Sequence, residues 1–281
     1  MAAHLAEQIA RLAAEFNGRL GVAAKNLRTG ERVEFQADVV FPTASMIKLP
    51  IQVELMRQVE AGHRRLDEVL EVREEDRVGG SGVLRHLSAG LRLPVRDLAF
   101  LMMNVSDNVA TNILIDLVGR ENVNRMLQAE GLGAIELRNK IDFRYAWDDP
   151  AHLGVGTPCA FAELMERVYH ARIVGPAARE EMLRTMGGVG AERLGRYLPL
   201  QPYAAELRQR GYHVGETVNL AGKTGALIGI RGHVAVVYGD HTEFIVAAMT
   251  DGSRDLSWGV EHDGVLTLAR VGKLLYEAWL Q

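Results

Sequence analysis

The sequence predicts an α+β fold, with an αβ lobe formed by residues 1–42 and 187–281 and an all-helical lobe formed by residues 43–186. Strand-like alternation of apolar residues is found mainly near the two ends of the chain, whereas the middle has mostly helical spacing. With 281 residues, 48% of them hydrophobic, the chain can bury a substantial core. We therefore expect a single compact fold in two lobes.

Each element follows from a local pattern. An opening helix is indicated by an apolar stripe that begins at Leu5 and that Gly18 can end. A hairpin is expected within residues 21–35, around Thr29-Gly30. Later strands are expected at about residues 217–222, 232–238 and 244–250, before a closing helix striped by Val265, Leu268, Val271, Leu275 and Trp279.

Three short motifs stand in a fixed order along the chain: Ser45-Met46-Ile47-Lys48, Ser106-Asp107-Asn108 and Lys223-Thr224-Gly225. A Ser-x-x-Lys alone is expected about once by chance in a chain of this length. The other two triplets are rarer, and their order is a further constraint. The full set is typical of class A β-lactamases and penicillin-binding proteins. From about Leu20 to its end, the chain resembles a class A β-lactamase-like serine hydrolase of the penicillin-recognising serine enzyme family.

The resemblance implies a β-lactamase/transpeptidase-like fold, in which an antiparallel sheet is flanked by the terminal helices and the active-site cleft lies between the two lobes. Pockets often occur at such junctions. The motif residues are therefore expected to meet in this cleft.

The first motif supplies a nucleophile and a base. Apolar residues at every fourth position from Ile47 predict a helix with Ser45 in its first turn and Lys48 on the same side. A serine hydroxyl needs a neighbouring base, and a lysine can act as one when burial or nearby cations lower its pKa. We expect an acyl-enzyme on Ser45 with Lys48 as base, and a kink at Pro50. Without the other motifs, a capping serine and a solvated lysine would be the better interpretation.

The second motif follows an apolar run and precedes a helical stretch, so it is expected on a turn between helices. By resemblance, Ser106 relays a proton to the leaving group and Asn108 hydrogen-bonds the substrate amide. Asp107 is expected to hold the turn. The alternative is an ordinary cap between two helices.

The third motif lies on a predicted strand that forms one wall of the site in the family. Lys223 would supply positive potential, and Thr224 would hydrogen-bond a substrate carboxylate. Gly225 would let the ligand approach the backbone. The amides of Ala226 and Ser45 would form the oxyanion hole.

Arg231 opens the next predicted strand, eight residues beyond the lysine of the third motif. In class A enzymes an arginine near this place helps to bind the substrate carboxylate, and a planar guanidinium suits that task. The alternative is a solvated arginine at the start of a strand.

The omega loop departs from the family pattern, because residues 136–158 contain no Glu-x-x-x-Asn to activate the deacylating water. Counting back from Thr157-Pro158, the glutamate's place falls on Ile141, the asparagine's on Tyr145 and the aspartate anchor's on Gly154. Asp142 is one residue away and is a candidate deacylation base, unless it only points to water or caps a turn. Asp148 and Asp149 are weaker candidates. Acylation is still expected, since a lysine route remains open.

Other classes of function have little support in the sequence. The net charge of −4 and the lack of basic runs argue against nucleic acid, and no apolar run is long enough for a transmembrane helix. None of the nine histidines forms a metal-binding motif, and no phosphate-binding loop is present, so we expect neither metal nor cofactor.

Gly79-Gly80-Ser81-Gly82 is expected to form a turn at the cleft rim. Cys159 is the only cysteine. No signal peptide is visible, so the protein is cytoplasmic or exported with its signal trimmed.

Two hypotheses follow for the function. The first is a serine hydrolase that forms an acyl-enzyme on a small-molecule acyl substrate, with β-lactams ahead of D-alanyl or other cell-wall peptides and simple esters. The second is a penicillin-binding or D-alanyl peptidase-like protein, or a binding module, that acylates without efficient turnover. The missing omega-loop glutamate favours the second, and the retained Ser-x-x-Lys argues against an inert scaffold.

Overall fold

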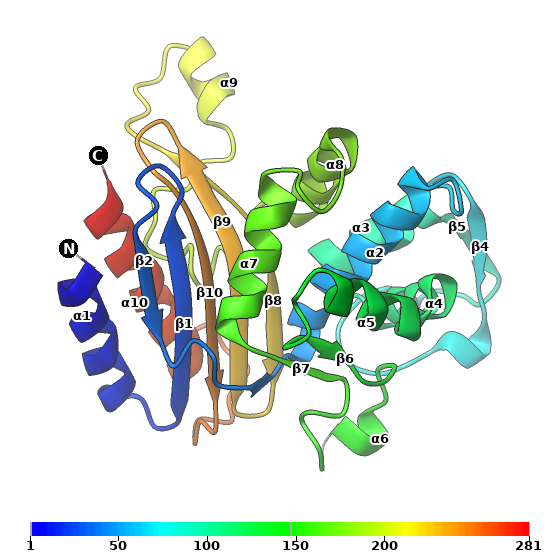
Figure 1. Cartoon of the computed structure of the whole chain (residues 1–281). Coiled ribbons are helices and arrows are strands. Elements are labelled where there is room, and N and C mark those ends of the chain that lie inside the picture. Colours follow the sequence, from blue (N-terminus) through cyan, green and yellow to red (C-terminus); the bar gives the residue numbers. More distant parts are fainter. Residues whose placement is uncertain (1, 147, 281) are drawn as a thin grey trace.

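An antiparallel sheet of five strands lies at the centre of the computed structural model, which describes residues 2–146 and 148–280 (Figure 1). The strands are arranged in the order β2-β1-β10-β9-β8. Their bounds are β1 (Arg19–Asn26), β2 (Arg32–Phe35), β8 (Val218–Leu227), β9 (Ile230–Gly239) and β10 (Glu243–Asp251). β1 pairs with β10 along its whole length, so the first and last strands of the chain are neighbours. This arrangement confirms the predicted α+β fold with an antiparallel sheet.

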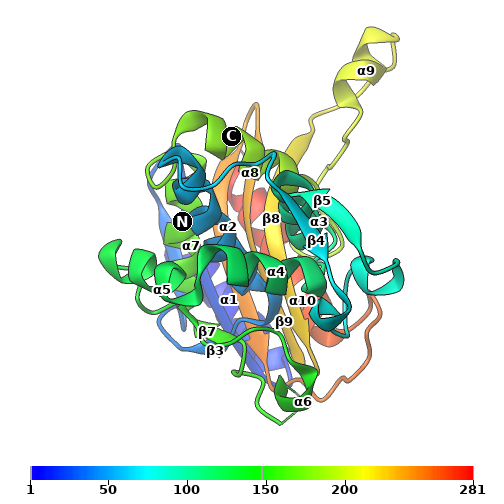
Figure 2. The same ribbon diagram turned by 90° about the vertical axis from the view of Figure 1, so that its right-hand side faces the viewer.

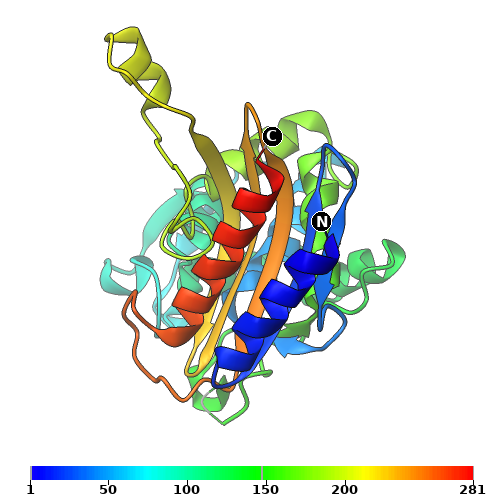
Figure 3. The same cartoon turned by 90° about the vertical axis from the view of Figure 1, so that its left-hand side faces the viewer.

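The two terminal helices, α1 (Ala2–Glu15) and α10 (Asp263–Trp279), cover one face of the sheet (Figure 3). Their apolar stripes pack on side chains that point to this face from the five strands. Trp279 closes the end of this core, because its ring packs edge-on against Phe244 and its Nε1 donates to Glu31 at 3.0 Å. The predicted terminal helices are therefore present and hold the outer face of the sheet.

The helical part of the chain lies on the opposite face (Figures 1 and 2). α2 runs through its centre, and every residue from Lys48 to Met56 is buried. α7 packs directly against β1, β9 and β10, although its residues fall within the range predicted for the helical lobe. The helices are α2 (Lys48–Glu60), α3 (Val95–Asn104), α4 (Asn108–Val118), α5 (Arg120–Ala129), α6 (Phe143–Ala146), α7 (Pro158–Tyr169) and α8 (Pro176–Met186).

Several short elements escaped the sequence analysis because two to four residues carry too little periodicity to be recognised. The short strands are β3 (Phe41–Pro42), β4 (Val69–Val72), β5 (Leu91–Pro94), β6 (Glu136–Leu137) and β7 (Gly154–Gly156). The 3₁₀ turns are η1 (Ala44–Ile47), η2 (Glu74–Asp76) and η3 (Leu84–His86). The helix α9 (Ala204–Gln209) lies on an arm that projects from the body before β8, and it buries none of its residues (Figures 1 and 3).

None of the helices within the described ranges combines the length and hydropathy needed to cross a bilayer.

The segment that precedes β8 is held against α10 by a close backbone contact. A Cβ atom at Gly272, in the middle of α10, would collide with the carbonyl oxygen of Leu194. Since Leu194 is fully buried and follows Arg193, this contact also fixes one part of the cleft described below.

We predict that Gly272→Ala lowers the free energy of unfolding by about 1–3 kcal/mol, because the added methyl group overpacks a contact with backbone. Urea titration followed by circular dichroism measures the change. Gly215→Ala is the matched control, since a Cβ at Gly215 meets nothing within 4 Å. Equal free energies of unfolding for the two variants would show that the segment around Leu194 moves aside without loss of stability.

Candidate active site

Ser45 lies in a strained turn that leads into α2. η1 carries Ser45, and α2 begins only at Lys48, so the helix starts later than the sequence predicted. Pro50 therefore falls in the first helical turn, where its missing amide costs no hydrogen bond. Ala44 has a φ of +44°, a left-handed conformation that is costly for a residue with a side chain and that often marks functional sites.

β8 approaches this turn closely enough to exclude a side chain. An ideal Cβ at Gly225 would lie 2.5 Å from the carbonyl oxygen of Thr43 and 3.2 Å from the amide nitrogen of Met46. The glycine of the third motif thus brings the strand against the turn that carries Ser45. The backbone of Ala226, the next residue, reaches the same cavity as Ser45.

Lys48 is fully buried, and its amine has three oxygen partners. Its Nζ lies 2.7 Å from the carbonyl oxygen of Ser106, 3.1 Å from Ser106 Oγ and 2.8 Å from Asn108 Oδ1. Burial lowers the pKa of Lys48 well below its usual value, and the nearby charge of Lys223 lowers it further, against an opposing effect of Asp107. An amine in this setting is suited to accept a proton.

The second motif forms a rigid turn before α4, as predicted. Asp107 caps α4 by accepting from the amide of Ala110, and its other oxygen accepts from the amides of Val83 and Leu84 at 2.6 and 2.8 Å. Ser106 has a φ of +56°. Asp107 thus holds the turn in the conformation that presents Ser106 to both lysines.

A cluster of buried cations lies on the other side of Ser106. Lys223 Nζ donates to Ser106 Oγ at 3.1 Å, and burial together with the charge of Arg193 lowers the pKa of Lys223 to about 7. Arg193 donates to the carbonyl oxygens of Gly225 and Gly232 at 2.7 and 2.9 Å, and it lines the cavity. Burial lowers its pKa to about 10, so the guanidinium keeps its charge at neutral pH. His233, also buried here, has a pKa lowered by burial and by these cations, and it stays neutral.

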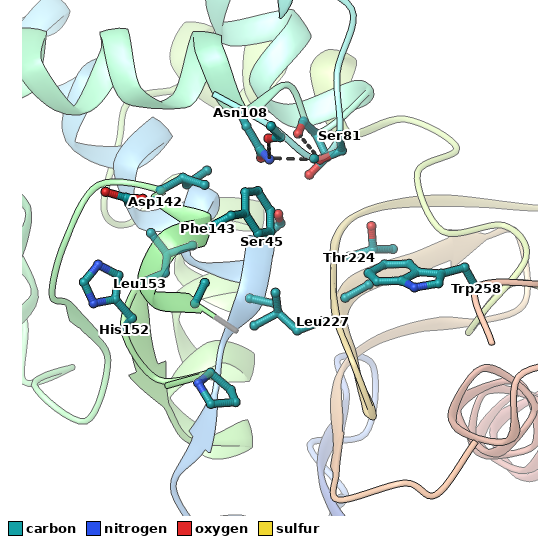
Figure 4. Close-up of a pocket in the computed structure, with 18 of the residues that line it drawn as sticks. Ser45, Ser81, Asn108, Asp142, Phe143, His152, Leu153, Thr224, Leu227 and Trp258 are labelled. Carbon is teal, nitrogen blue, oxygen red and sulfur yellow. Dashed lines mark hydrogen bonds between the residues drawn. The ribbon is translucent and has the colours of Figure 1, made fainter. Parts of the chain in front are cut away.

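These residues surround a cavity of about 640 Å³ (Figure 4). Ser45, Ser106, Asn108, Thr224 and Ala226 all line it, so the structure brings together residues from all three motifs. Gly79, Gly80 and Ser81 line its rim, as expected for this turn. Ser81 was not predicted as a site residue, yet its Oγ donates to the carbonyl oxygen of Ser106 at 2.7 Å.

Arg193 is a charged cavity residue that the sequence analysis missed. It lies in the connection between α8 and β8, where no motif or periodicity marks it. Only the folding of this connection against β8 brings its guanidinium to Gly225. An alignment of related sequences is the kind of signal that could have found it.

In the omega loop an aliphatic side chain faces the cavity at the place expected for the glutamate. Ile141 lines the cavity, and its backbone is clamped by Asn112, whose Oδ1 accepts from the Ile141 amide at 2.8 Å and whose Nδ2 donates to the Ile141 carbonyl at 3.0 Å. Ile141, the residue that counting without gaps put at the glutamate's place, thus lies at the cavity wall.

Asp142 is not presented to Ser45. Its carboxylate accepts from the Arg144 guanidinium at 2.6 and 3.0 Å and from the Arg144 amide at 3.0 Å. These bonds lower its pKa, which makes it a weaker base. Although Asp142 borders the cavity, Figure 4 shows its carboxylate turned away from Ser45, with Phe143 between them in this view. The pairing of Asp142 with Arg144 thus argues against the role expected for Asp142 as the deacylation base. Asp149 caps a turn through the amide of Ala151.

Arg231 also differs from the expectation. It is 2% exposed and does not line the cavity. Its guanidinium donates to the carbonyl oxygens of Leu227, Ile230 and Ser257, each at 2.7 Å. The tight turn between β8 and β9 directs the side chain to these backbone groups, so the cavity contains Arg193 in place of Arg231.

Within residues 2–146 and 148–280, no group of three or more histidine, cysteine, aspartate or glutamate side chains is arranged to hold a metal ion.

Comparison with known proteins identifies the family. A model described as "Beta-lactamase enzyme family" matches residues 4–279. The crystal structure of a β-lactamase from Sphaerobacter thermophilus is similar with a TM-score of 0.85 and 29% identity, covering 99% of this chain and 97% of that one. A leucine-to-glutamate variant of PBP-A, solved as an acyl-enzyme complex with penicillin G, has a TM-score of 0.82 and 25% identity, covering 98% of this chain and 96% of its own.

Beta-lactamase L2 of Stenotrophomonas maltophilia is 29% identical over 181 residues, which are 63% of this chain and 58% of L2. The match thus spans little more than half the length of that relative. The family model, in contrast, extends over nearly the whole chain. The chain therefore belongs to the beta-lactamase enzyme family.

Proposed function

We propose that the protein is a class A β-lactamase-like serine hydrolase that forms an acyl-enzyme on Ser45. The observation that carries this proposal is the fully buried amine of Lys48, three residues after Ser45 and bonded to Ser106 Oγ and Asn108 Oδ1. Burial and the charge of Lys223 favour the neutral amine, which is the form that can act as a base. Ser45 is assigned as the nucleophile because its side chain lines the cavity and because β8 closely approaches the turn that carries it.

Acylation begins when Lys48 Nζ takes the proton from Ser45 as its Oγ attacks the substrate carbonyl carbon. The Oγ–C bond forms, and the amides of Ser45 and Ala226 stabilise the oxyanion, a role typically worth about two to three powers of ten in rate per donor. The scissile C–N bond then breaks. Ser106 gives its proton to the leaving nitrogen and regains one from the Lys48 ammonium, with which it is in hydrogen-bond contact at 3.1 Å.

The polar end of the cavity supports a substrate that carries a carboxylate. Lys223 and Arg193 supply positive charge, and Thr224 lines the cavity beside them. Asn108 lies at the opposite rim, where it would hydrogen-bond the substrate amide. This pattern fits a β-lactam or another amide with a carboxylate near the leaving nitrogen, and Gly225 leaves room for the ligand at the strand.

Deacylation is the step that we expect to be slow. Water must add to the acyl carbon and lose a proton before the Oγ–C bond breaks to release the acid and free Ser45. Ile141 cannot accept that proton, and the carboxylate of Asp142 is occupied by Arg144. We therefore propose slow turnover, which makes a penicillin-binding or peptidase-like role the second candidate. The PBP-A variant captured as an acyl-enzyme with penicillin G supports this candidate.

Incubation with penicillin G is predicted to give a covalent adduct on Ser45. The adduct should persist much longer than the time an efficient β-lactamase needs for one turnover. Intact-mass spectrometry through time, with loss of the drug followed in parallel, measures both steps. Ser45→Ala should abolish the adduct, because Ser45 is the proposed nucleophile. Adduct formation by the Ser45→Ala variant would disprove the assignment of the nucleophile.

Ile141→Glu is predicted to accelerate deacylation by about 10²-fold or more, since a positioned general base contributes about 10²–10⁴-fold. The measurement is the decay rate of the penicillin adduct. Ile141→Gln is the matched control, because it has the same size and no base. Asp142→Asn should leave the decay unchanged; a slower decay in that variant would restore Asp142 as the base.

Acylation by penicillin is predicted to weaken as pH rises through about 7. Below this pKa Lys223 is charged and attracts the carboxylate, and above it the charge is lost from the free enzyme. Lys48 accepts a proton only in its neutral form, so the rate also falls on the acidic side of the pKa of Lys48, which burial lowers well below its usual value. Second-order acylation rates measured across this range test the profile. A neutral ester should lack the alkaline decline, and Lys223→Arg should move that decline to higher pH; the same decline with both substrates would exclude Lys223 as its cause.

A further inference from the structure

The glycine-rich turn at the rim of the cavity packs directly on the second motif. Gly80 has a φ of +84°, and a Cβ atom there would lie 2.6 Å from Asn108 Nδ2. Gly82 has a φ of +107°, and a Cβ atom there would lie 2.3 Å from the carboxyl group of Asp107. Glycine suits both positions, since it adopts a positive φ without strain and leaves room for the contact. Ser81, the residue between them, is therefore held against the second motif.

Hydrogen bonds fix this contact and orient the side chain of Asn108. The amide of Asn108 donates to the carbonyl oxygen of Ser81 at 3.1 Å, and Asn108 Nδ2 donates to the carbonyl oxygen of Gly79 at 2.9 Å. Since Nδ2 points to Gly79, the oxygen Oδ1 of Asn108 faces Lys48 and Ser81. Figure 4 shows Ser81 and Asn108 side by side at the edge of the cavity.

The three oxygen atoms that contact Lys48 Nζ each have a second donor nearby. The carbonyl oxygen of Ser106 accepts from Lys48 Nζ and from Ser81 Oγ, each at 2.7 Å. Asn108 Oδ1 lies 2.8 Å from Lys48 Nζ and 3.3 Å from Ser81 Oγ. Ser106 Oγ lies 3.1 Å from Lys48 Nζ and also 3.1 Å from Lys223 Nζ. An oxygen that already has a donor stabilises a nearby ammonium less, because the two positive hydrogens repel each other.

This set of partners suits a neutral amine better than an ammonium. An ammonium donates three hydrogen bonds, whereas a neutral amine donates two and presents a lone pair. The carbonyl and amide oxygens can accept the two, and the hydroxyl of Ser106 can donate to the lone pair. Among charged groups, Lys223 on β8 disfavours the ammonium of Lys48, and Asp107 before α4 favours it. The carboxylate of Asp107, however, accepts from three backbone amides and not from Lys48.

We infer that Ser81 is a positioning residue for acylation, whose hydroxyl bonds to the oxygens that hold Lys48 and so weakens their hold on an ammonium there. Ser81 acts through Lys48 and not on the substrate. The glycines on either side of it bring the hydroxyl to these oxygens. The catalytic consequence rests on the proposed function, whereas the effect on the amine can be measured without a substrate.

Ser81→Val and Ser81→Thr form the matched pair that tests the inference. The two side chains have the same shape, and only threonine keeps the hydroxyl. Because Ser81 is exposed, alanine would let water replace the hydroxyl, and the larger valine opposes this. Ser88→Val is the control, since Ser88 is also exposed, lies further along the same segment and does not line the cavity.

The first measurement is a titration of the lysine Cε signals by NMR after labelling with carbon-13 lysine. The chain has only five lysines, and the Lys48 signal is the one absent from Lys48→Arg. In Ser81→Val the midpoint of this signal should move to higher pH by up to about one pH unit, as expected for one hydrogen bond. Ser81→Thr and Ser88→Val should leave the midpoint unchanged.

The second measurement is the pH profile of acylation by penicillin G. Its acidic limb should move with the NMR midpoint in Ser81→Val and stay in place in Ser81→Thr, because both measurements report the same amine. A merely structural role of Ser81 would lower the rate at every pH and leave the limb where it is. If Ser81→Val does not fold, Ser81→Cys replaces it, since a thiol is a weaker donor and should move both readouts in the same direction.

Two results would overturn the inference. Equal NMR midpoints in the wild type and Ser81→Val would do so whatever the rates. Equal shifts in Ser81→Val and Ser81→Thr would also do so, since the shape of residue 81 and not its hydroxyl would then matter. A shift confined to Ser81→Val, in a protein whose wild type forms no adduct on Ser45, would uphold the effect on the amine and reject the proposed function.

Discussion

The burial of one amine, that of Lys48, is the constraint on which the rest of the structure depends. A charged ammonium in the interior is costly, and the neighbouring charge of Lys223 increases that cost, so the neutral form is favoured. A neutral amine still needs hydrogen-bond partners. The turn at Ser106 and Asn108 supplies them, and Asp107 holds that turn through three backbone amides. The helical part of the chain is thus arranged around a single side chain at the start of α2.

The sheet forms the second half of the site, and the backbones of the two halves are in close contact. Gly225 permits β8 to contact the turn that carries Ser45, which places Ala226 beside the nucleophile. The same strand brings Lys223 to Ser106, and Arg193 binds the backbone of β8 and β9. A shift of β8 would therefore alter the base, the cations and the oxyanion hole together.

The cavity has cationic side chains near Thr224 and apolar side chains along the omega loop, and in the proposed function these two regions bind different parts of the substrate. The cations are concentrated where a leaving group with a carboxylate would lie. In the proposed reaction the region that includes Ile141 would receive the acyl group, and Ile141 cannot accept a proton from water. The proposed function thus has a nucleophile and a base for acylation, while the carboxylate of Asp142 is paired with Arg144.

The sequence by itself determined the family and the α+β class with its terminal helices, and it indicated the residues proposed to carry acylation, because these depend on motifs and on periodicity that local residues encode. It also predicted that Ile141 occupies the place of the family's glutamate, by counting along the omega loop from Thr157-Pro158. Only the tertiary structure decided the roles of Asp142, Arg193 and Arg231. Their side chains are directed by local backbone and by contacts with distant segments: Asp142 turns to Arg144, Arg193 folds over β8, and Arg231 is bound by Ser257 from a loop 26 residues away. Spacing along a chain specifies which groups are present, whereas the direction in which a charged side chain points depends on partners that only folding brings near.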